Sequence, residues 1–236
     1  NEYQMIYDLI KILSSVISVY LIFRFFSDYM SYDRAIIASF IFVLYPLHDT
    51  TLYWYMTLQY ILAPAILLYA HHLIRNNKIR KGFLVTIVGS FLSYASPPYL
   101  FGLTVIFLYE KKLKKAIVFV TPGILYVAYY FWMKFNYAGL ERRINSDLSI
   151  LDFLKQMLIQ PLSFLESAIG PSYWLEVFYA IESIGFISII IIAMILIFSF
   201  IRVKSFSTVC KLPKSLYIGL ISVLLLSFGI FALTGL

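Results

Sequence analysis

A short polar segment, HDTT at residues 48–51, lies between two apolar stretches of the chain. Ionisable side chains at a membrane boundary are usually retained for a task. Free N–H groups at the start of a helix also attract an anionic ligand such as a phosphate. One interpretation is therefore that Asp49 and His48 line a water-facing cavity, where the faces of Tyr53 and Trp54 suit a sugar ring.

The same segment also suits a purely structural role. Residues 49–51 carry the short oxygen side chains that cap a helix beginning at Leu52, and a carboxylate favours the positive end of a helix dipole. Pro46 would end the preceding helix. Capping accounts for Asp49 but gives no role to His48 or to the neighbouring aromatic residues, so both interpretations stay open.

Three further charged residues stand at positions where charge can serve a function. Arg142 and Arg143 are adjacent, and a guanidinium group binds a phosphate through paired hydrogen bonds. The alternative is that both are solvated or contact lipid headgroups. Glu182 lies near the start of an apolar stretch, where a carboxylate marks a cavity unless it reaches water. All three are candidate substrate-binding residues, each with a structural alternative.

The composition indicates a membrane protein. Of the 236 residues, 61% are hydrophobic and 13% are charged, whereas a soluble domain carries about 25% charged residues. The mean hydropathy is +0.86. Apolar runs, several near the roughly 20 residues that cross a bilayer, occupy residues 6–26, 35–47, 52–74, 82–109, 116–133, 177–201 and 216–236. These runs do not alternate as barrel strands do, so we expect an all-α, polytopic transmembrane protein.

The net charge of +7 does not indicate nucleic-acid binding, because the cations stand in short clusters beside the apolar runs. Such clusters are typical of membrane topology and of contact with anionic lipid. The single cysteine, Cys210, excludes an internal disulfide and a multi-cysteine metal site. The sequence has no cofactor fingerprint, so we expect no cofactor, while a requirement for a divalent metal stays open without a residue pattern to support it.

The run at residues 82–109 decides the predicted topology. Its 28 residues would form a helix of about 42 Å, too long for one upright span and too short for two. Pro97 and Pro98 in its middle favour a break. If the chain turns back there, 14 of the 19 Lys and Arg residues share one side, against 10 if it crosses once. The positive-inside rule therefore favours a short re-entrant hairpin at 82–109.

The same orientation predicts the remaining layout. The N-terminus and the polar segment 134–176 lie on the outer side. Leu residues at spacings of three and four predict an amphipathic helix in the outer interface at residues 148–168, interrupted at Pro161. No internal repeat is evident. We expect a single transmembrane domain over residues 1–236, and we expect it to be a piece of a longer protein, because the chain lacks an initial Met and stops inside an apolar run.

The order of residues within 46–54 (proline, histidine, acidic, small, hydrophobic, tryptophan) resembles the start of an early transmembrane helix in GT-C type glycosyltransferases. The bacterial and TMTC-like relatives of protein O-mannosyltransferases are the nearest match. The stretch FLSYASPPYLFGLTVIFLYEKKLKK is similar to their short helical hairpin between basic turns. The resemblance covers roughly residues 5–135. It departs at the hairpin tip, where Tyr94, Ser96 and two prolines replace the family's Lys or acid. The family's usual catalytic carboxylate lies in a first outer loop, which would precede residue 1.

This resemblance implies an enzyme, or part of one, that transfers a sugar from a polyprenyl-phosphate donor to a protein or glycan acceptor. The reaction would take place on the outer face of a prokaryotic cytoplasmic membrane. Its catalytic candidates are Asp49 and His48, and its substrate-binding candidates are Trp54, Tyr53, Tyr94, Ser96, Arg142, Arg143 and Glu182. Two other classes stay open. One is a lipid or polysaccharide transporter or flippase, with discontinuous helices in two related halves, and the other is a non-catalytic membrane subunit.

Overall fold

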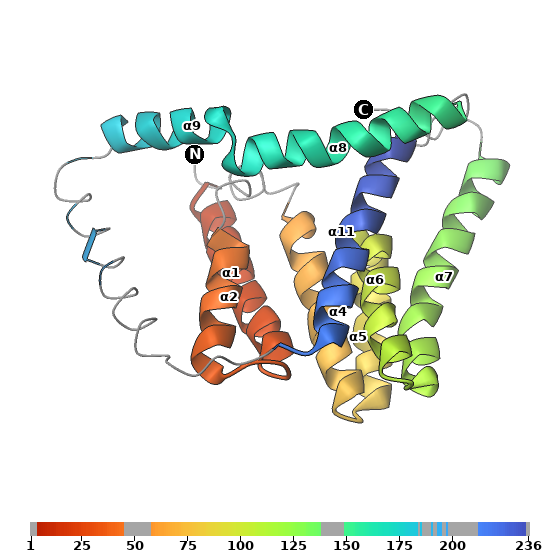
Figure 1. Ribbon diagram of the computed structural model, residues 1–236. Coiled ribbons are helices and arrows are strands. Elements are labelled where there is room, and N and C mark those ends of the chain that lie inside the picture. The colour runs from red at the N-terminus through yellow and green to blue at the C-terminus, as the bar shows by residue number, and fades with distance from the viewer. Residues whose placement is uncertain are drawn as a thin grey trace.

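The computed structural model describes residues 4–44, 58–137, 149–183 and 212–234, together with 185, 190, 193, 194 and 197. Within these ranges the secondary structure is helical and contains no strand (Figure 1). The all-α prediction is therefore confirmed for the part of the chain that is described. The helices are α1 Gln4–Phe26, α2 Tyr32–Leu44, α4 Gln59–Arg75, α5 Ile79–Leu92, α6 Ser96–Tyr109, α7 Leu113–Asn136, α8 Ile150–Ile169, α9 Pro171–Ser183 and α11 Lys214–Thr234.

Three of the described helices, α1, α7 and α11, are long and apolar enough to cross a membrane. Helix α6 is also apolar but is shorter, with 14 residues. Helices α4 and α2 have 17 and 13 residues, and they cover parts of the apolar runs at 52–74 and 35–47. The apolar runs of the sequence thus become helices of two lengths, and only the longer class is long enough to span a bilayer upright.

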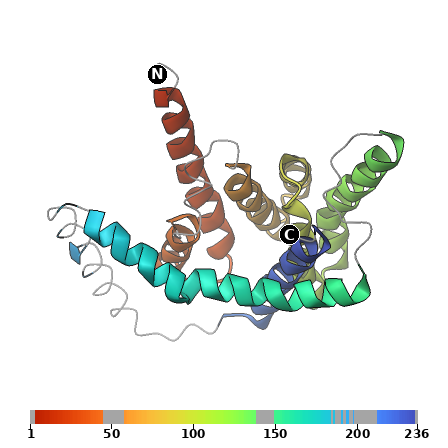
Figure 2. The same ribbon diagram turned by 90° about the horizontal axis from the view of Figure 1, so that it is seen from above.

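Most of the helices form one bundle, and the others lie across one end of it. Helices α1, α2, α4, α5, α6, α7 and α11 lie side by side, and α8 and α9 lie across one end of them (Figures 1 and 2). We call this end the α8 end. The opposite end holds the turns that join α1 to α2, α4 to α5 and α6 to α7. We call it the basic end, because eleven of the described Lys and Arg residues lie there, namely Arg24, Arg34, Arg75, Lys78, Arg80, Lys81, Lys111, Lys112, Lys114, Lys115 and Lys214.

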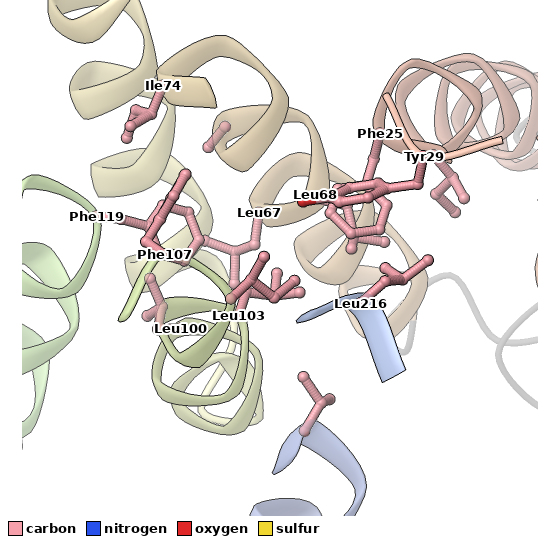
Figure 3. Close-up of a cluster of buried hydrophobic side chains, with 14 of the residues drawn as sticks. Phe25, Tyr29, Leu67, Leu68, Ile74, Leu100, Leu103, Phe107, Phe119 and Leu216 are labelled. Atoms are coloured by element: carbon pink, nitrogen blue, oxygen red, sulfur yellow. The ribbon is translucent and has the colours of Figure 1, made fainter. Parts of the chain in front are cut away.

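The core lies between α1, α4, α6, α7 and α11, nearer the basic end. Its largest fully buried side chains include Phe25, Leu67, Phe107, Phe119 and Leu216, one from each of these helices (Figure 3). Helix α4 runs through the middle, with most of its side chains buried. The sequence pattern agrees with this position, since α4 is apolar on nearly every face, as a helix with neighbours on all sides requires.

Small residues let α6 and α11 approach closely. A Cβ atom at Gly102 would lie 2.5 Å from the backbone nitrogen of Val223, and a Cβ at Gly219 would collide with Ile106. Close helix contact through glycines is typical of helix pairs in membranes. The α6–α11 contact therefore depends on both glycines.

The substitution Gly102→Ala is expected to lower the free energy of unfolding by about 1–3 kcal/mol, because the backbone of Val223 cannot move aside. Gly229→Ala is the matched control, since its Cβ would meet only the sulfur of Met157, at 4.0 Å. Denaturant titration in mixed micelles measures both. Equal stability of the two variants would contradict close α6–α11 packing.

A turn separates α5 from α6 at residues 93–95, beside the paired prolines. Ser93 is extended, and the Ser96 hydroxyl donates a hydrogen bond of 2.7 Å to the carbonyl of Gly89. Pro97 and Pro98 lie at the first positions of α6, where the missing backbone donors cost nothing. The prolines thus start the second helix of the pair, and the turn itself precedes them.

Two consecutive helical hairpins, α4–α5 and α6–α7, have the same turn geometry, and we call this likeness the repeat. The α4–α5 and α6–α7 hairpins are related by a shift of 34 residues, which pairs Tyr60 with Tyr94. The same shift pairs Pro64 with Pro98, Lys78 with Lys112, Lys81 with Lys115, and Gly89 with Gly123. Both turns share one backbone form, with φ of 61° at Asn77 and 57° at Lys111.

Helix α8 begins close to its predicted position. Ser149 caps it by accepting a hydrogen bond of 3.1 Å from the backbone N–H of Asp152. The helix continues through Pro161 to Ile169, so the predicted interruption at Pro161 is wrong. Gln156, Met157 and Gln160 are partly buried, whereas Leu151, Leu158 and Leu162 are largely exposed. Helix α8 therefore presents leucines away from the bundle and mixed side chains toward it.

Candidate functional site

Two pockets meet at the turn between α5 and α6, at the α8 end. The larger has a volume of about 640 Å³ and is lined by α4, the α5–α6 turn, α6, α8 and α11. The smaller has a volume of about 290 Å³ and is lined by the α5–α6 turn, α6, α7 and α11. Tyr94, Pro98 and Ile230 line both. The two pockets therefore adjoin each other at these three residues.

The larger pocket, which we call the polar pocket, has hydroxyl and amide groups in its wall. Helix α8 contributes Gln160, Ser163 and Ser167, and α11 contributes Ser227. Tyr60 donates a hydrogen bond of 3.0 Å from its hydroxyl to that of Tyr94, so the paired residues of the repeat meet at the pocket. None of the described residues that line this pocket is charged at neutral pH. Uncharged hydrogen-bonding groups beside aromatic rings suit a carbohydrate.

The smaller pocket, which we call the apolar groove, is lined almost entirely by carbon. Phe101, Tyr126, Tyr130 and Leu226 form much of its wall, together with the two prolines of α6. A groove of this composition suits a hydrocarbon chain. The polar pocket and the apolar groove together provide the two environments that an amphipathic ligand needs.

The structure places three of the residues predicted from sequence. Tyr94 lies at the junction of the polar pocket and the apolar groove. Ser96 is fully buried, and its hydroxyl is engaged with Gly89 within the turn. Glu182 is exposed on α9 and is not among the residues that line the polar pocket or the apolar groove. The other predicted site residues lie outside the described residues, and they are His48, Asp49, Tyr53, Trp54, Arg142 and Arg143.

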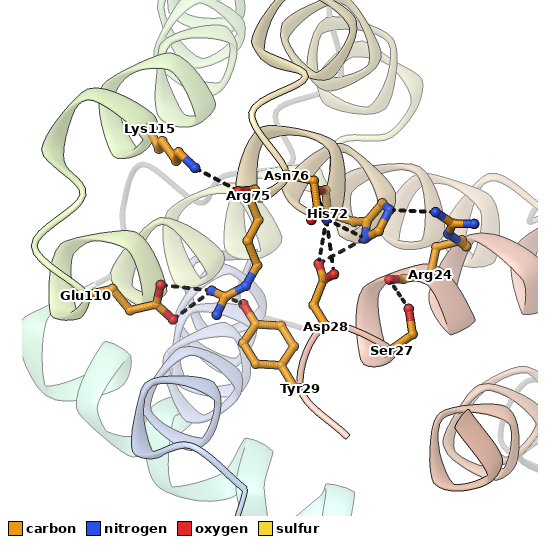
Figure 4. Close-up of polar contacts among 9 residues, drawn as sticks. All are labelled: Arg24, Ser27, Asp28, Tyr29, His72, Arg75, Asn76, Glu110 and Lys115. Carbon is orange, nitrogen blue, oxygen red and sulfur yellow. Dashed lines mark hydrogen bonds and ion pairs between the residues drawn. The ribbon is translucent and has the colours of Figure 1, made fainter. Parts of the chain in front are cut away.

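A second polar cluster lies at the basic end (Figure 4). We call it the polar network, and it joins Arg24, Asp28, Tyr29, His72, Arg75, Asn76, Glu110, Lys112 and Ser215. No motif in the sequence indicates the polar network, because its members come from four separate regions of the chain and each region alone resembles an ordinary charged helix end. Neither of the two pockets described above is lined by a residue of the polar network, and the side chains of the network form hydrogen bonds with one another.

His72 connects the first half of the polar network. Its Nδ1 lies 2.9 Å from a carboxylate oxygen of Asp28, and its Nε2 lies 3.2 Å from a guanidinium nitrogen of Arg24. Since a guanidinium group can only donate, Nε2 accepts and Nδ1 carries the proton. The imidazole of His72 therefore links α1 and the following turn to α4. Its neighbour His71 is instead buried in the core, stacked on Phe107.

Glu110 connects the second half of the polar network. Its carboxylate accepts hydrogen bonds of 2.7 and 2.9 Å from Arg75, one of 2.6 Å from Lys112 and one of 3.1 Å from Ser215. Arg75 also donates to the Tyr29 hydroxyl and stacks over its ring. One carboxylate therefore ties α4 and α11 to the turn between α6 and α7, and we interpret the polar network as structural.

Acidification is expected to weaken the polar network through Glu110. Partial burial alone would raise the pKa of the Glu110 carboxyl, but the hydrogen bonds from Lys112 and Arg75 outweigh it and hold the pKa below its ordinary value of 4.5. A depressed pKa means that the stabilisation is complete above the ordinary value and is lost as pH falls through the pKa of the folded state. Unfolding titrations between about pH 3 and pH 7 should show that acidification lowers the free energy of unfolding less in Glu110→Gln than in the unaltered protein. Equal decreases in the two proteins would contradict a stabilising role of the Glu110 carboxylate.

Within the described ranges, no group of three or more His, Cys, Asp or Glu side chains is placed to hold a metal ion. Comparison with known protein families, curated proteins and solved structures finds no match to this chain. The fold and the site together define an all-helical protein with three helices able to span a membrane and a two-part pocket at one end of its bundle.

Proposed function

We propose that the chain is a GT-C type membrane glycosyltransferase, or a part of one, that uses a polyprenyl-phosphate-linked sugar. The observation that carries this proposal is the contiguity of the polar pocket and the apolar groove at Tyr94. A lipid-linked sugar has the same two-part chemistry, with a polyhydroxylated ring at one end and an isoprenoid chain at the other. The resemblance of residues 5–135 to GT-C enzymes points to the same substrate class.

The proposed membrane placement follows from the charges and the helix lengths. Helices α1, α7 and α11 span the bilayer, and α5 and α6 form a short hairpin that enters from the basic end and returns. The basic end is cytoplasmic, in accordance with the positive-inside rule. The α8 end faces outward, and the exposed leucines of α8 contact lipid at the outer interface.

In this arrangement the sugar occupies the polar pocket and the isoprenoid chain occupies the apolar groove. Hydroxyl and amide groups of Gln160, Ser163 and Ser227 bind the sugar, and Tyr94 lies where the two parts of the donor join. Asp49 deprotonates or orients the acceptor hydroxyl, and Arg142 and Arg143 stabilise the leaving phosphate. The roles of Asp49 and the two arginines come from sequence and resemblance.

Filling the polar pocket tests this function. Ser227→Trp places a large side chain in the pocket and is expected to reduce sugar transfer at least tenfold in proteoliposomes supplied with a polyprenyl-phosphate-linked sugar. Ser222→Trp is the matched control, because Ser222 lies on the same helix, is also partly buried, also donates to the carbonyl four residues earlier, and does not line the polar pocket. Unaltered transfer by Ser227→Trp, or equal loss in both variants, would count against the pocket.

The repeat favours a second candidate function. Parallel repeats are common in transporters, where the substrate site lies at the interface between repeats. Tyr60 and Tyr94 are equivalent in the two hairpins and meet at the polar pocket. A lipid transporter or flippase would move a labelled polyprenyl-phosphate-linked sugar between leaflets without breaking the bond between sugar and phosphate. The same proteoliposomes therefore separate the two functions by their product.

A further inference from the structure

The repeat places two basic turns at the basic end. The first contains Lys78, Arg80 and Lys81 in the sequence NKIRK at residues 77–81, and the second has the sequence KKLKK at residues 111–115. In each, a residue with positive φ is followed by the start of a helix that carries cations in its first turn. The two turns thus present similar charges on the same backbone form.

The two turns are neighbours in space. The ammonium group of Lys115 donates a hydrogen bond of 2.7 Å to the backbone carbonyl of Arg75, at the end of α4, and Arg75 in turn binds Glu110 (Figure 4). Helices α5 and α7, which the turns begin, are also in contact. The cations of both turns therefore form one continuous surface, which we call the basic rim and define as residues 77–81 and 111–115.

The basic rim carries more positive charge than its surroundings neutralise. Its sequence holds seven Lys and Arg residues. Glu110, the acid between its two turns, is already occupied by Arg75, Lys112 and Ser215. Lys78, Arg80, Lys81, Lys111 and Lys114 are exposed. Cations in the first turn of a helix also oppose the helix dipole, so an external anion would stabilise both helices.

The apolar helix surfaces next to the basic rim indicate which kind of anion it binds. Leu84 and Val88 are largely exposed on α5 just beyond the first turn, and Leu113 and Ile117 are largely exposed on α7 just beyond the second. Each turn therefore places cations at the end of an apolar helix surface, which is the arrangement that fits a phospholipid with an anionic headgroup. A soluble polyanion would leave these apolar surfaces uncovered.

We propose that each turn of the basic rim binds the headgroup of one anionic phospholipid, so that the repeat creates two equivalent lipid sites. The proposal rests on the membrane placement given under Proposed function, but it is independent of sugar transfer. Acyl chains lie along α5 at the first site and along α7 at the second. Lys112 and Lys115 hold the turns in place, while the exposed cations contact the phosphates.

Native mass spectrometry of protein released from nanodiscs tests the proposal by counting retained lipids. With phosphatidylglycerol we expect two retained lipids, and with phosphatidylcholine none. The first-turn variant, Lys78→Gln with Arg80→Gln and Lys81→Gln, should retain one. The second-turn variant, Lys111→Gln with Lys114→Gln, should also retain one, and the combination should retain none.

Matched controls separate charge from folding. Replacing the same lysines with arginine should keep both lipids, and Lys134→Gln with Lys155→Gln, away from the basic rim, should also keep both. Identical lipid counts in all variants, or equal retention of phosphatidylcholine, would overturn the proposal. Displacement of phosphatidylglycerol by a short RNA or by inorganic phosphate would also overturn it, in favour of a soluble anion. Two retained lipids on a protein without transferase activity would contradict only the proposed function.

Discussion

The substitution Glu110→Ala is expected to lower the free energy of unfolding by about 2–4 kcal/mol, the largest effect on stability of any single change considered for this chain. The carboxylate accepts hydrogen bonds from Arg75, Lys112 and Ser215, which belong to three separate segments. Removing it leaves Arg75 without its counter-ion in a partly buried position. The magnitude lies at the lower edge of the range for buried pairs because solvent reaches part of this one. Denaturant titration in mixed micelles measures it.

Asp8→Ala is the matched control for this prediction. It removes the exposed ion pair between Asp8 and Lys11 on α1, and surface pairs contribute only about 0.2–1 kcal/mol. The two variants should therefore differ clearly in stability. If Glu110→Ala unfolded at the same denaturant concentration as Asp8→Ala, the polar network would not hold the basic end together.

The largest effect on activity is expected from Asp49→Asn. The amide keeps the size of the side chain and much of its capping ability but cannot accept a proton, so sugar transfer should fall by about 10²–10⁴-fold with the amount of folded protein unchanged. Transfer of a radiolabelled sugar from its polyprenyl-phosphate carrier in proteoliposomes provides the measurement.

Asp33→Asn serves as the control, because Asp33 is an acidic residue in the first turn of a helix at the basic end. It should leave transfer unaltered. If Asp49→Asn also retained full turnover, Asp49 would be a helix cap and the catalytic assignment would fail, although the pocket assignments would be untouched.

The sequence predicted the elements better than their assembly. Apolar runs gave the helices, because a stretch without a polar face can satisfy its backbone in a membrane only as a helix. Pro97 and Pro98 correctly indicated a break near them, but they lie in the first turn of α6, and the turn at residues 93–95 precedes them. Pro161 led to a wrong prediction of an interruption, because helix α8 continues through it.

The polar network and the repeat escaped the sequence analysis for different reasons. His72 and Glu110 have sequence surroundings that explain them locally, and their partners Asp28 and Ser215 are distant in the chain. The repeat has few identical residues because each hairpin has different neighbours. Gly89 packs on Ile66 and Leu67 of α4, and Gly123 packs on Leu100 of α6. The shift of 34 residues pairs Ile66 with Leu100, so this contact is kept within each hairpin.

Only some of the residues that line the two pockets could be predicted from the sequence. Tyr94 was found through the hairpin tip, whereas Gln160, Ser163 and Ser227 were not considered, because serine and glutamine on apolar helices are common and carry no motif. Their convergence depends on α8 lying across the end of the bundle, above α11 (Figure 2). No local pattern specifies that placement.

The central claim, that the polar pocket and the apolar groove bind one lipid-linked sugar, is tested most directly by photo-crosslinking. A polyprenyl-phosphate-linked sugar with a diazirine on its isoprenoid chain should label Phe101, Tyr126 or Tyr130 in the groove, and excess unlabelled donor should suppress the labelling. Labelling spread equally over exposed apolar residues of α1, such as Leu9 and Leu13, and insensitive to unlabelled donor, would contradict the claim.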